Sequence, residues 1–307
     1  MDIRQNVPLA PLTTFGIGGV ARYFAKTRTE ADILKALEWA RAKGVRAVML
    51  SGGSNVLVPD GGLDALVIHV AEGKSALIDD DLVADAGCDL LSLIRSCAES
   101  GVGGWEKLAG IPGSIGGAVR GNAGAFGTEI KDMAVKVRAL NGETGEAREF
   151  NNAECDFSYR NSFFIENPKW IITKVTVSLR PTDEAASTRL IDETIHERER
   201  RHLQNVRAAG SFFMNPAAPP EIVAMFEKEK GVKSREGRVP AGWLIEKAGM
   251  KGAKVGGAIA SLQHPNYIVN TGGATAHDVD KLAKRIKEQV FTSFGVELVE
   301  EAALLGR

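Results

Sequence analysis

The sequence has little of several features that mark common protein classes. Aromatic residues make up 6% of its 307 positions, and its three cysteines, Cys88, Cys97 and Cys155, form no C-x-x-C pair. An odd number of widely spaced cysteines argues against a disulfide scaffold and a zinc site, so no metal is expected. The formal net charge is −1, from 38 basic and 39 acidic residues, with no basic block. We therefore expect no nucleic acid partner.

Long hydrophobic runs are missing as well. No stretch approaches the roughly 20 apolar residues that cross a bilayer, and the N-terminal sequence MDIRQNVPLAPLTTF lacks the apolar core of a signal peptide. We expect a soluble, cytoplasmic protein with no membrane partner.

The two common nucleotide-binding fingerprints are also absent. No G-x-G-x-x-G opens a helix in the glycine-rich stretches, and Gly73-Lys74-Ser75 is preceded by Ile68 where a P-loop has its first glycine. These absences argue against the Rossmann and P-loop folds.

What the chain does have is glycine in two clusters. Residues 108–127 contain seven glycines and one charged residue, Arg120, and a second turn, Ser51-Gly52-Gly53-Ser54-Asn55, follows an apolar run. Such density is expected where φ is positive or where a ligand approaches the main chain closely. Amides in such turns can bind an anion, and we expect Ile111, Ile115 and Val119 to form apolar walls for a flat ring. A tightly packed turn between two strands is the alternative.

The order of helical and strand patterns predicts an α+β protein. Helices are expected at 29–44, 89–100, from Asp183 onward, and at 220–230, 241–248 and 276–294; strands are expected at 134–140, 147–150 and 170–179, with Asn141-Gly142 as a hairpin turn. We expect a first α/β unit at 1–72, a second, α+β unit at 73–186, a third domain at 187–296, and a C-terminal strand at 297–307.

Six motifs in this order resemble the UDP-N-acetylenolpyruvoylglucosamine reductase (MurB) family nearly from end to end. They are Thr13-Thr14-Phe15-Gly16-Ile17-Gly18-Gly19, Ser51 to Val56, Gly110 to Gly127, Tyr159-Arg160-Asn161-Ser162, Ala209-Gly210-Ser211-Phe212-Phe213 with Asn215-Pro216, and Gly242-Trp243-Leu244-Ile245-Glu246. Tyr159 is followed within about ten residues by the next strand, which leaves no room for the substrate-covering loop of one branch of the family. The chain therefore resembles the shorter, loop-lacking branch.

The resemblance implies a fold and a set of cofactors. The fold is a two-subdomain FAD-binding fold of the vanillyl-alcohol-oxidase or PCMH-like type, with a third α+β domain for the substrate. By resemblance, residues 1–72 and 73–186 are the two FAD-binding subdomains, residues 187–296 bind the substrate, and the strand at 297–307 returns to the FAD region. Noncovalent FAD is implied, with NADPH as hydride donor. The residues implied in FAD binding are Gly52, Gly53, Ser54, Asn55, Val56, Gly110, Ile111, Pro112, Gly113, Ser114, Gly116, Gly117, Asn122, Ala123 and Gly124.

Three residues carry the implied catalysis. Ser211, beside Phe212, can donate a proton in a dry site, or it can instead bond its own turn. Arg160 suits a planar carboxylate, with a structural ion pair as the alternative. By resemblance, Ser211 protonates the substrate carbon, while Arg160 and Glu301 stabilise the charge that develops. The family's terminal L-E-P-E-V-R appears here as Leu298 to Ala303, so Glu300 is an alternative to Glu301.

The implied reaction is NADPH-dependent reduction of UDP-N-acetylglucosamine enolpyruvate to UDP-N-acetylmuramate, a step of peptidoglycan precursor synthesis. Tyr159, Asn215, Lys251 and Gln263 are assigned to the UDP-sugar substrate, and a monomer is expected. Two alternatives remain open. One is another FAD-dependent oxidase of the same fold, and the other is a catalytically silent protein that binds FAD or a UDP-sugar, which Met214 and Ala303 favour because they depart from the family pattern.

Overall fold

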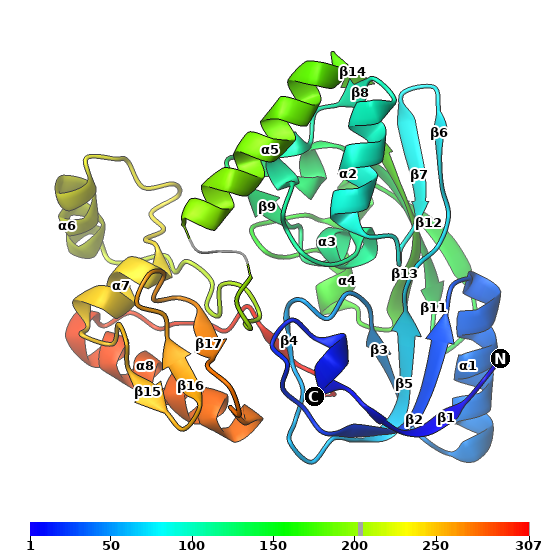
Figure 1. The fold of residues 1–307 in the computed structure, drawn as a ribbon, viewed down its shortest axis with the longest axis horizontal. Helices are drawn as coiled ribbons and strands as arrows, with labels where there is room; N and C mark the ends of the chain where they lie inside the picture. The colour runs from blue at the N-terminus through cyan, green and yellow to red at the C-terminus, as the bar shows by residue number, and fades with distance from the viewer. Residues whose placement is uncertain (202–204, 307) are drawn as a thin grey trace. The chain divides into compact units, whose positions relative to one another are not determined.

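The computed structural model describes residues 1–201 and 205–306 (Figure 1). The chain forms two compact units. The first unit comprises Met1–Val7, Ala21–Gly53 and Leu63–Arg200, and the second comprises 8–20, 54–62 and the residues from Arg201 onward. The domain boundary expected after residue 186 falls inside the helix Glu184–Arg200, which belongs to the first unit. The division by function into two FAD subdomains and a substrate domain stays a prediction.

The first unit contains two larger sheets. One has the strand order β1-β2-β5-β3, with β2, β5 and β3 parallel, and the other, β12-β11-β13-β7-β6, is antiparallel. The strands are β1 Arg4–Pro8, β2 Val20–Thr27, β3 Ala47–Leu50, β5 Leu63–Val70, β6 Ser75–Ile78, β7 Asp81–Asp85, β11 Ala134–Asn141, β12 Ala147–Asn151 and β13 Trp170–Ser178. The nearly continuous burial of β5 is typical of a parallel strand covered on both faces.

The α-helices of this unit are α1 Glu30–Lys43, α2 Leu90–Glu99, α3 Ile115–Arg120, α4 Phe163–Glu166 and α5 Glu184–Arg200. Side chains cap the N-termini of α1, α2 and α3. Thr29 forms a capping box with Asp32, and Gly44 closes α1 with φ +65°. α1 packs against β5 (Figure 1). The carboxylate of Glu30 in α1 accepts hydrogen bonds from Nε and Nη2 of Arg138 on β11, at 2.9 and 3.0 Å. This pair connects the helix to the antiparallel sheet.

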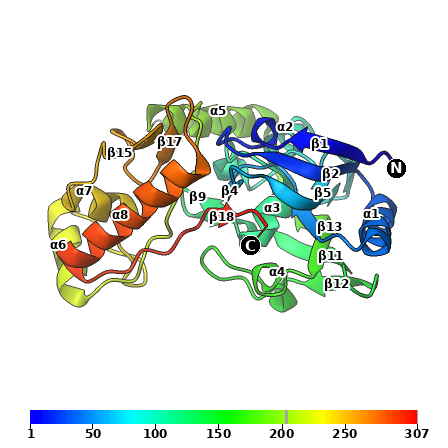
Figure 2. The ribbon, with the colours of Figure 1, turned by 90° about the horizontal axis from the view of Figure 1, so that it is seen from below.

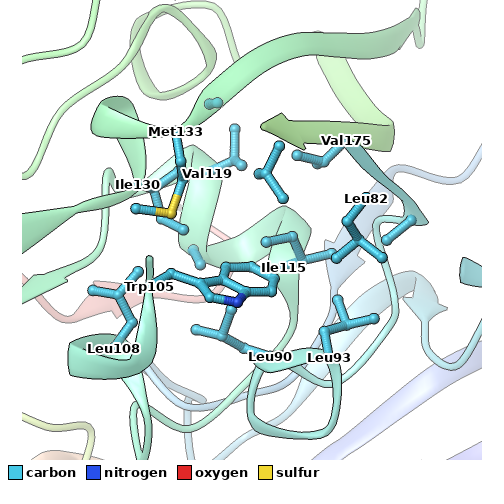
Figure 3. Close-up of a cluster of buried hydrophobic side chains, with 14 of the residues drawn as sticks. Leu82, Leu90, Leu93, Trp105, Leu108, Ile115, Val119, Ile130, Met133 and Val175 are labelled. Atoms are coloured by element: carbon cyan, nitrogen blue, oxygen red, sulfur yellow. The ribbon is translucent and has the colours of Figure 1, made fainter. Parts of the chain in front are cut away.

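The core of the antiparallel half surrounds Trp105, which is completely buried (Figure 3). Ile115 and Val119 of α3 point into this core and are also completely buried. The expectation that they line a flat ring is therefore wrong for both, because α3 turns its apolar side chains toward α2 and β13. Only Ile111 of the three is partly exposed.

The cysteines lie in the same half of the molecule and are free and buried. Burial raises the pKa of the Cys97 and Cys155 thiols to about 12. We expect all three thiols to resist a disulfide reagent at pH 8 in the native protein and to react fully in denaturant, because the thiolate is the reacting form. Rapid labelling of Cys97 or Cys155 before unfolding would contradict this packing.

The second unit is built from three helices and short strands. The helices are α6 Pro220–Lys230, α7 Ala241–Lys247 and α8 Ala276–Phe294, and the strands are β15 Lys254–Val255, β16 Ala258–Ala260 and β17 Ile268–Asn270. α8 packs against α7, β15 and β16 (Figure 2). Thr275 begins α8 with a capping box, and Gly295 closes it at φ +65°.

The remaining strands are short pairs. β8 Val102–Gly103 pairs with β14 Arg180–Pro181, β9 Gly124–Ala125 pairs with β10 Thr128–Glu129, and β4 Val56–Leu57 pairs in parallel with β18 Ala303–Leu304. The last pair places the C-terminal strand β18 beside β4, the strand that follows the glycine turn at 51–55. In the part of the chain that the structure describes, no helix is both long and apolar enough to cross a membrane.

The sequence interpretation missed two local features. Helix α3 begins inside the glycine-rich stretch, where Ser114 caps it by accepting the amide of Gly117. The loop between β11 and β12 is longer than a two-residue turn: it runs from 142 to 146, and Gly145 takes the left-handed position with φ +77°. Asn141 accepts the amides of Glu143 and Thr144 and so shapes this loop.

Candidate functional site

The two glycine turns of the first unit lie in direct contact. A Cβ atom on Gly52 would lie 2.5 Å from Cα of Gly113 and 2.8 Å from the backbone nitrogen of Ser114, so only glycine fits at position 52. The Ser51 and Ser114 hydroxyls are 2.7 Å apart, and Ser51 Oγ donates to the carbonyl of Val70. Ser114 therefore donates to Ser51, since a hydroxyl has a single proton.

This contact gathers backbone donors from both turns. Among residues 1–201 and 205–306, the amides of Gly52, Gly53, Gly113 and Ser114 donate no hydrogen bond to the protein. Gly53 and Gly113 have φ of +62° and +112°, a conformation that side chains disfavour. Unpaired amides on two turns that lie in contact are donors of the kind that bind a diphosphate. The residues present therefore fit the pyrophosphate of FAD.

Other residues assigned to FAD have structural duties as well. A Cβ on Gly116 would lie 2.6 Å from the Cβ of Ala86, so this glycine allows α3 to pack closely. Asn55 donates through Nδ2 to the carbonyl of Glu301, at 3.1 Å. Asn122 is completely buried, and its amide group is bound to Ser158, Glu129 and Lys131. Their roles toward FAD stay predictions.

Arg160 occupies a tight turn in the first unit. Ser158 and Asn161 exchange backbone hydrogen bonds of 3.1 and 3.2 Å, and Arg160 between them has φ +55°. A left-handed conformation costs an arginine roughly 1–2 kcal/mol, so the surrounding contacts must hold it. Arg160 Nη2 donates to the carbonyl of Gly124 at 3.0 Å, and the guanidinium lies over the Tyr159 ring at 5.1 Å.

Ser211 belongs to the second unit and begins the segment with Phe212 and Phe213, both buried. In the described part of the chain, no hydrogen bond is formed by its hydroxyl. The alternative that Ser211 bonds its own turn is therefore not supported. A partly buried, unpaired hydroxyl beside two aromatic rings is available to a ligand.

Asn266 fixes the segment that carries Ser211. Its backbone carbonyl accepts the amide of Phe212 at 2.7 Å, its Oδ1 accepts the amide of Phe213 at 3.0 Å, and its Nδ2 donates to the carbonyl of Phe213 at 2.8 Å. Asn266 is 2% exposed. The sequence interpretation missed this residue. In the sequence it is marked only as a polar side chain between Pro265 and Tyr267, and the structure buries both of these neighbours.

The C-terminal residues 299–301 pair with residues 212–214 of the segment that carries Ser211, which Asn266 also contacts. Phe213 forms an antiparallel bridge with Glu300, and the amide of Glu301 donates to the carbonyl of Phe212 at 2.8 Å. Because Asn55 holds the carbonyl of Glu301, both backbone polar groups of that residue are fixed. The structure thus places Glu301 beside the segment of Ser211.

The two candidate glutamates differ in their surroundings. Both carboxylate oxygens of Glu300 pair with Lys287 of α8, at 3.0 and 3.1 Å, on the exposed surface. Glu301 is half-buried. Adjacent residues of an extended segment point to opposite sides, so the Glu300 carboxylate lies away from that of Glu301.

We predict a large difference between two matched substitutions. Glu301→Gln should lower the turnover number by about 10²-fold, as loss of one group that stabilises transition-state charge typically does. Glu300→Gln should leave turnover nearly unchanged, because an exposed ion pair contributes at most about 1 kcal/mol to stability. Steady-state kinetics of both variants check this, and equal losses would contradict the assignment of Glu301.

The residues assigned to the substrate differ in their surroundings within the protein. Asn215 Oδ1 accepts the amide of Ala241, the first residue of α7, at 3.0 Å, so Asn215 also starts that helix. Lys251 is exposed and pairs with Glu246 at 2.7 Å. Gln263 is exposed in the turn that leads to Asn266. Tyr159 belongs to the first unit and Asn215, Lys251 and Gln263 to the second. All four assignments stay predictions.

Comparison with known proteins gives matches to both parts of the chain. Residues 21–151 match a family model described as FAD binding domain, and residues 201–305 match the UDP-N-acetylenolpyruvoylglucosamine reductase C-terminal domain. A UDP-N-acetylenolpyruvoylglucosamine reductase of Synechococcus sp. (strain JA-3-3Ab) is 36% identical over 99% of this chain and 91% of the relative. One from Carboxydothermus hydrogenoformans is 37% identical over 99% and 94%.

A solved structure agrees with these matches. The crystal structure of UDP-N-acetylenolpyruvylglucosamine reductase (MurB) from Thermus caldophilus aligns with a TM-score of 0.78 and 31% identity, covering 99% of this chain and all of that one. The fold and the matched FAD binding domain thus define a flavoprotein that binds FAD. More narrowly, the chain belongs to the UDP-N-acetylenolpyruvoylglucosamine reductase family.

These comparisons confirm several expectations from the sequence. The family, the α+β FAD-binding fold with a further α+β domain, the oxidoreductase class and FAD as cofactor are confirmed. They leave the individual site residues untested.

Proposed function

We propose that this protein reduces UDP-N-acetylglucosamine enolpyruvate to UDP-N-acetylmuramate with NADPH, through noncovalently bound FAD. The observation that carries the proposal is the end-to-end match with reductases of this name, at 36% identity over 99% of the chain. The pair of glycine turns with unpaired amides supports it, since FAD needs a diphosphate site.

When bound, FAD would supply hydride-transfer chemistry between NADPH and the terminal carbon of the enolpyruvyl double bond. Gly52, Gly53, Gly113 and Ser114 would hold the cofactor diphosphate through their amides. Close contact of the two turns excludes side chains there, so the chain binds the anion with main-chain dipoles instead of lysine or arginine.

Side chains of the protein then stabilise the negative charge that develops on the substrate and donate the proton. Hydride addition leaves negative charge on the neighbouring carbon and its carboxylate. Arg160 stabilises the carboxylate through its forked N–H groups, and Glu301 assists. The Ser211 hydroxyl donates its proton to the neighbouring carbon and is reprotonated from solvent. One hydride and one proton are thus added across the double bond, which yields the lactyl ether.

The UDP-sugar is proposed to contact Tyr159, Asn215, Lys251 and Gln263. Lys251 can meet a phosphate if its exposed pair with Glu246 opens, which costs little free energy at the surface. Tyr159 and β13 are separated by residues 160–169, which include only the short helix α4. We therefore place the protein in the shorter branch without the substrate-covering loop.

The proposal extends to the state and place of the enzyme. We propose that the enzyme is a cytoplasmic monomer. We also propose that it has no nucleic acid partner, because its 38 basic and 39 acidic residues nearly balance. Light scattering at working concentrations tests the oligomeric state.

A direct assay tests the reaction. Without oxygen, purified protein with FAD should oxidise more than one equivalent of NADPH per flavin only when the enolpyruvyl substrate is added, and the product mass should exceed the substrate mass by two hydrogen atoms. Substrate without the enolpyruvyl group is the control. Continued NADPH oxidation without substrate, or no product when substrate is added, would overturn the proposal, and the second result would favour the alternative of a silent binding protein.

A further inference from the structure

The turn that carries Arg160 is attached to the glycine-rich segment by three hydrogen bonds. Asn122 Nδ2 donates to the carbonyl of Ser158 at 2.8 Å, Ser162 Oγ donates to the carbonyl of Arg120 at 2.6 Å, and Arg160 Nη2 donates to the carbonyl of Gly124 at 3.0 Å. The anchors all lie within residues 120–124, which comprise the last residue of α3 and the four residues after it.

Asn122 is the central anchor. It is completely buried and has φ +40°, a left-handed conformation that asparagine tolerates better than most residues. Besides Ser158, its Nδ2 donates to Glu129 at 3.2 Å, and its Oδ1 accepts the amide of Lys131 at 3.1 Å. This one amide group therefore joins the glycine-rich segment, the β9–β10 hairpin and the start of the Arg160 turn.

The turn needs such anchors because Arg160 is itself in the left-handed region, at φ +55°. An isolated turn would relax to an ordinary backbone conformation, which would swing the guanidinium away. The hydrogen bond from Asn122 to Ser158, the first residue of the turn, opposes this relaxation. Breaking it would leave one N–H of the buried Asn122 amide without a partner.

We propose that Asn122 is a positioning residue that acts through Arg160: it locks the 158–161 turn so that the guanidinium meets the substrate carboxylate. The proposal rests on the proposed function, and it replaces direct cofactor contact as the main role of the Asn122 side chain. It also implies that residues 120–124 connect the FAD segment to the catalytic arginine by protein contacts alone.

The test compares three variants in separate half-reactions, followed by flavin absorbance without oxygen. Asn122→Gly keeps the left-handed backbone accessible and removes the amide group, and Asn122→Asp keeps the size and loses both donors. Asn152→Ala is the control, because Asn152 Nδ2 also donates to two backbone carbonyls of this unit, those of Lys131 and Ala134, but does not contact the 158–161 turn.

We expect both Asn122 variants to retain FAD and to be reduced by NADPH at the wild-type rate. Substrate-dependent reoxidation should slow by about 10- to 100-fold, as misplacement of a catalytic group by about 1 Å does. In an Arg160→Lys background, Asn122→Gly should cause little further loss, because residues that act as one unit are not additive. Asn152→Ala should behave as wild type.

Other outcomes overturn the inference. FAD loss in Asn122→Asp would make Asn122 a cofactor contact, and losses that multiply with Arg160→Lys would make its role independent of the arginine. Unchanged reoxidation in both Asn122 variants would also refute it. Failure of the proposed function is distinguishable, since wild-type protein itself would then show no substrate-dependent reoxidation.

Discussion

Replacement of Ser211 by alanine should leave flavin reduction by NADPH nearly intact and slow substrate-dependent reoxidation by about 10²–10⁴-fold. The reason is that a proton donor to the substrate carbon has no part in hydride transfer from NADPH. The Ser211 hydroxyl has no hydrogen bond within the described residues, so its removal breaks no structural contact. Anaerobic stopped-flow absorbance measures the two rates separately.

Two further variants sharpen this prediction. Ser211→Cys should recover part of the reoxidation rate, because a thiol of similar size can donate a proton. Asn266→Ala should impair the same half-reaction by releasing the segment that carries Ser211, and it should also lower thermal stability, since two backbone groups of Phe213 lose their partner. Equal slowing of both half-reactions in Ser211→Ala would contradict its role as proton donor.

Replacement of Gly52 by valine should abolish FAD retention. The Cβ atom would lie 2.5 Å from Cα of Gly113, and because this neighbour is backbone, the two turns must separate. Overpacking of this kind costs about 1–3 kcal/mol, and separation also disperses the amides that bind the diphosphate. We expect colourless protein on purification and a dissociation constant for FAD raised at least about 100-fold, measured by flavin fluorescence titration.

Gly121→Ala is the matched control for this substitution. Gly121 lies in the same glycine-rich stretch, but its φ is −92° and an added Cβ would be 3.7 Å from the nearest atom, the carbonyl oxygen of Gly117. That variant should bind FAD as wild type does. Yellow Gly52→Val protein with unchanged affinity would contradict the placement of the diphosphate at these turns.

The sequence allowed much of this fold to be predicted, because local signals sufficed. Helix α8 has both its capping threonine and its terminal glycine in sequence, and the helix follows them. The two glycine clusters also lie within residues 21–151, which match the FAD binding domain. What could not be predicted is that Gly52 contacts Gly113, since 61 positions separate them and no local pattern encodes a tertiary contact.

The errors in the site have a similar origin. Ile115 and Val119 seemed suited to line a ring because the helix α3 was not foreseen in so glycine-rich a stretch. Asn266 was missed because a single asparagine in a polar loop has no periodic signal, although its amide holds Phe213. The left-handed φ of Arg160 was likewise hidden, since arginine gives no sign of it.

The central claim is that FAD bound to this chain carries hydride from NADPH to an enolpyruvyl UDP-sugar. The most direct test is the visible spectrum of the purified holoprotein without oxygen. We predict that one equivalent of NADPH bleaches the flavin band and that UDP-N-acetylglucosamine enolpyruvate then restores it, with UDP-N-acetylmuramate formed in equal amount. A bleached flavin that stays reduced when the substrate is added would contradict the account.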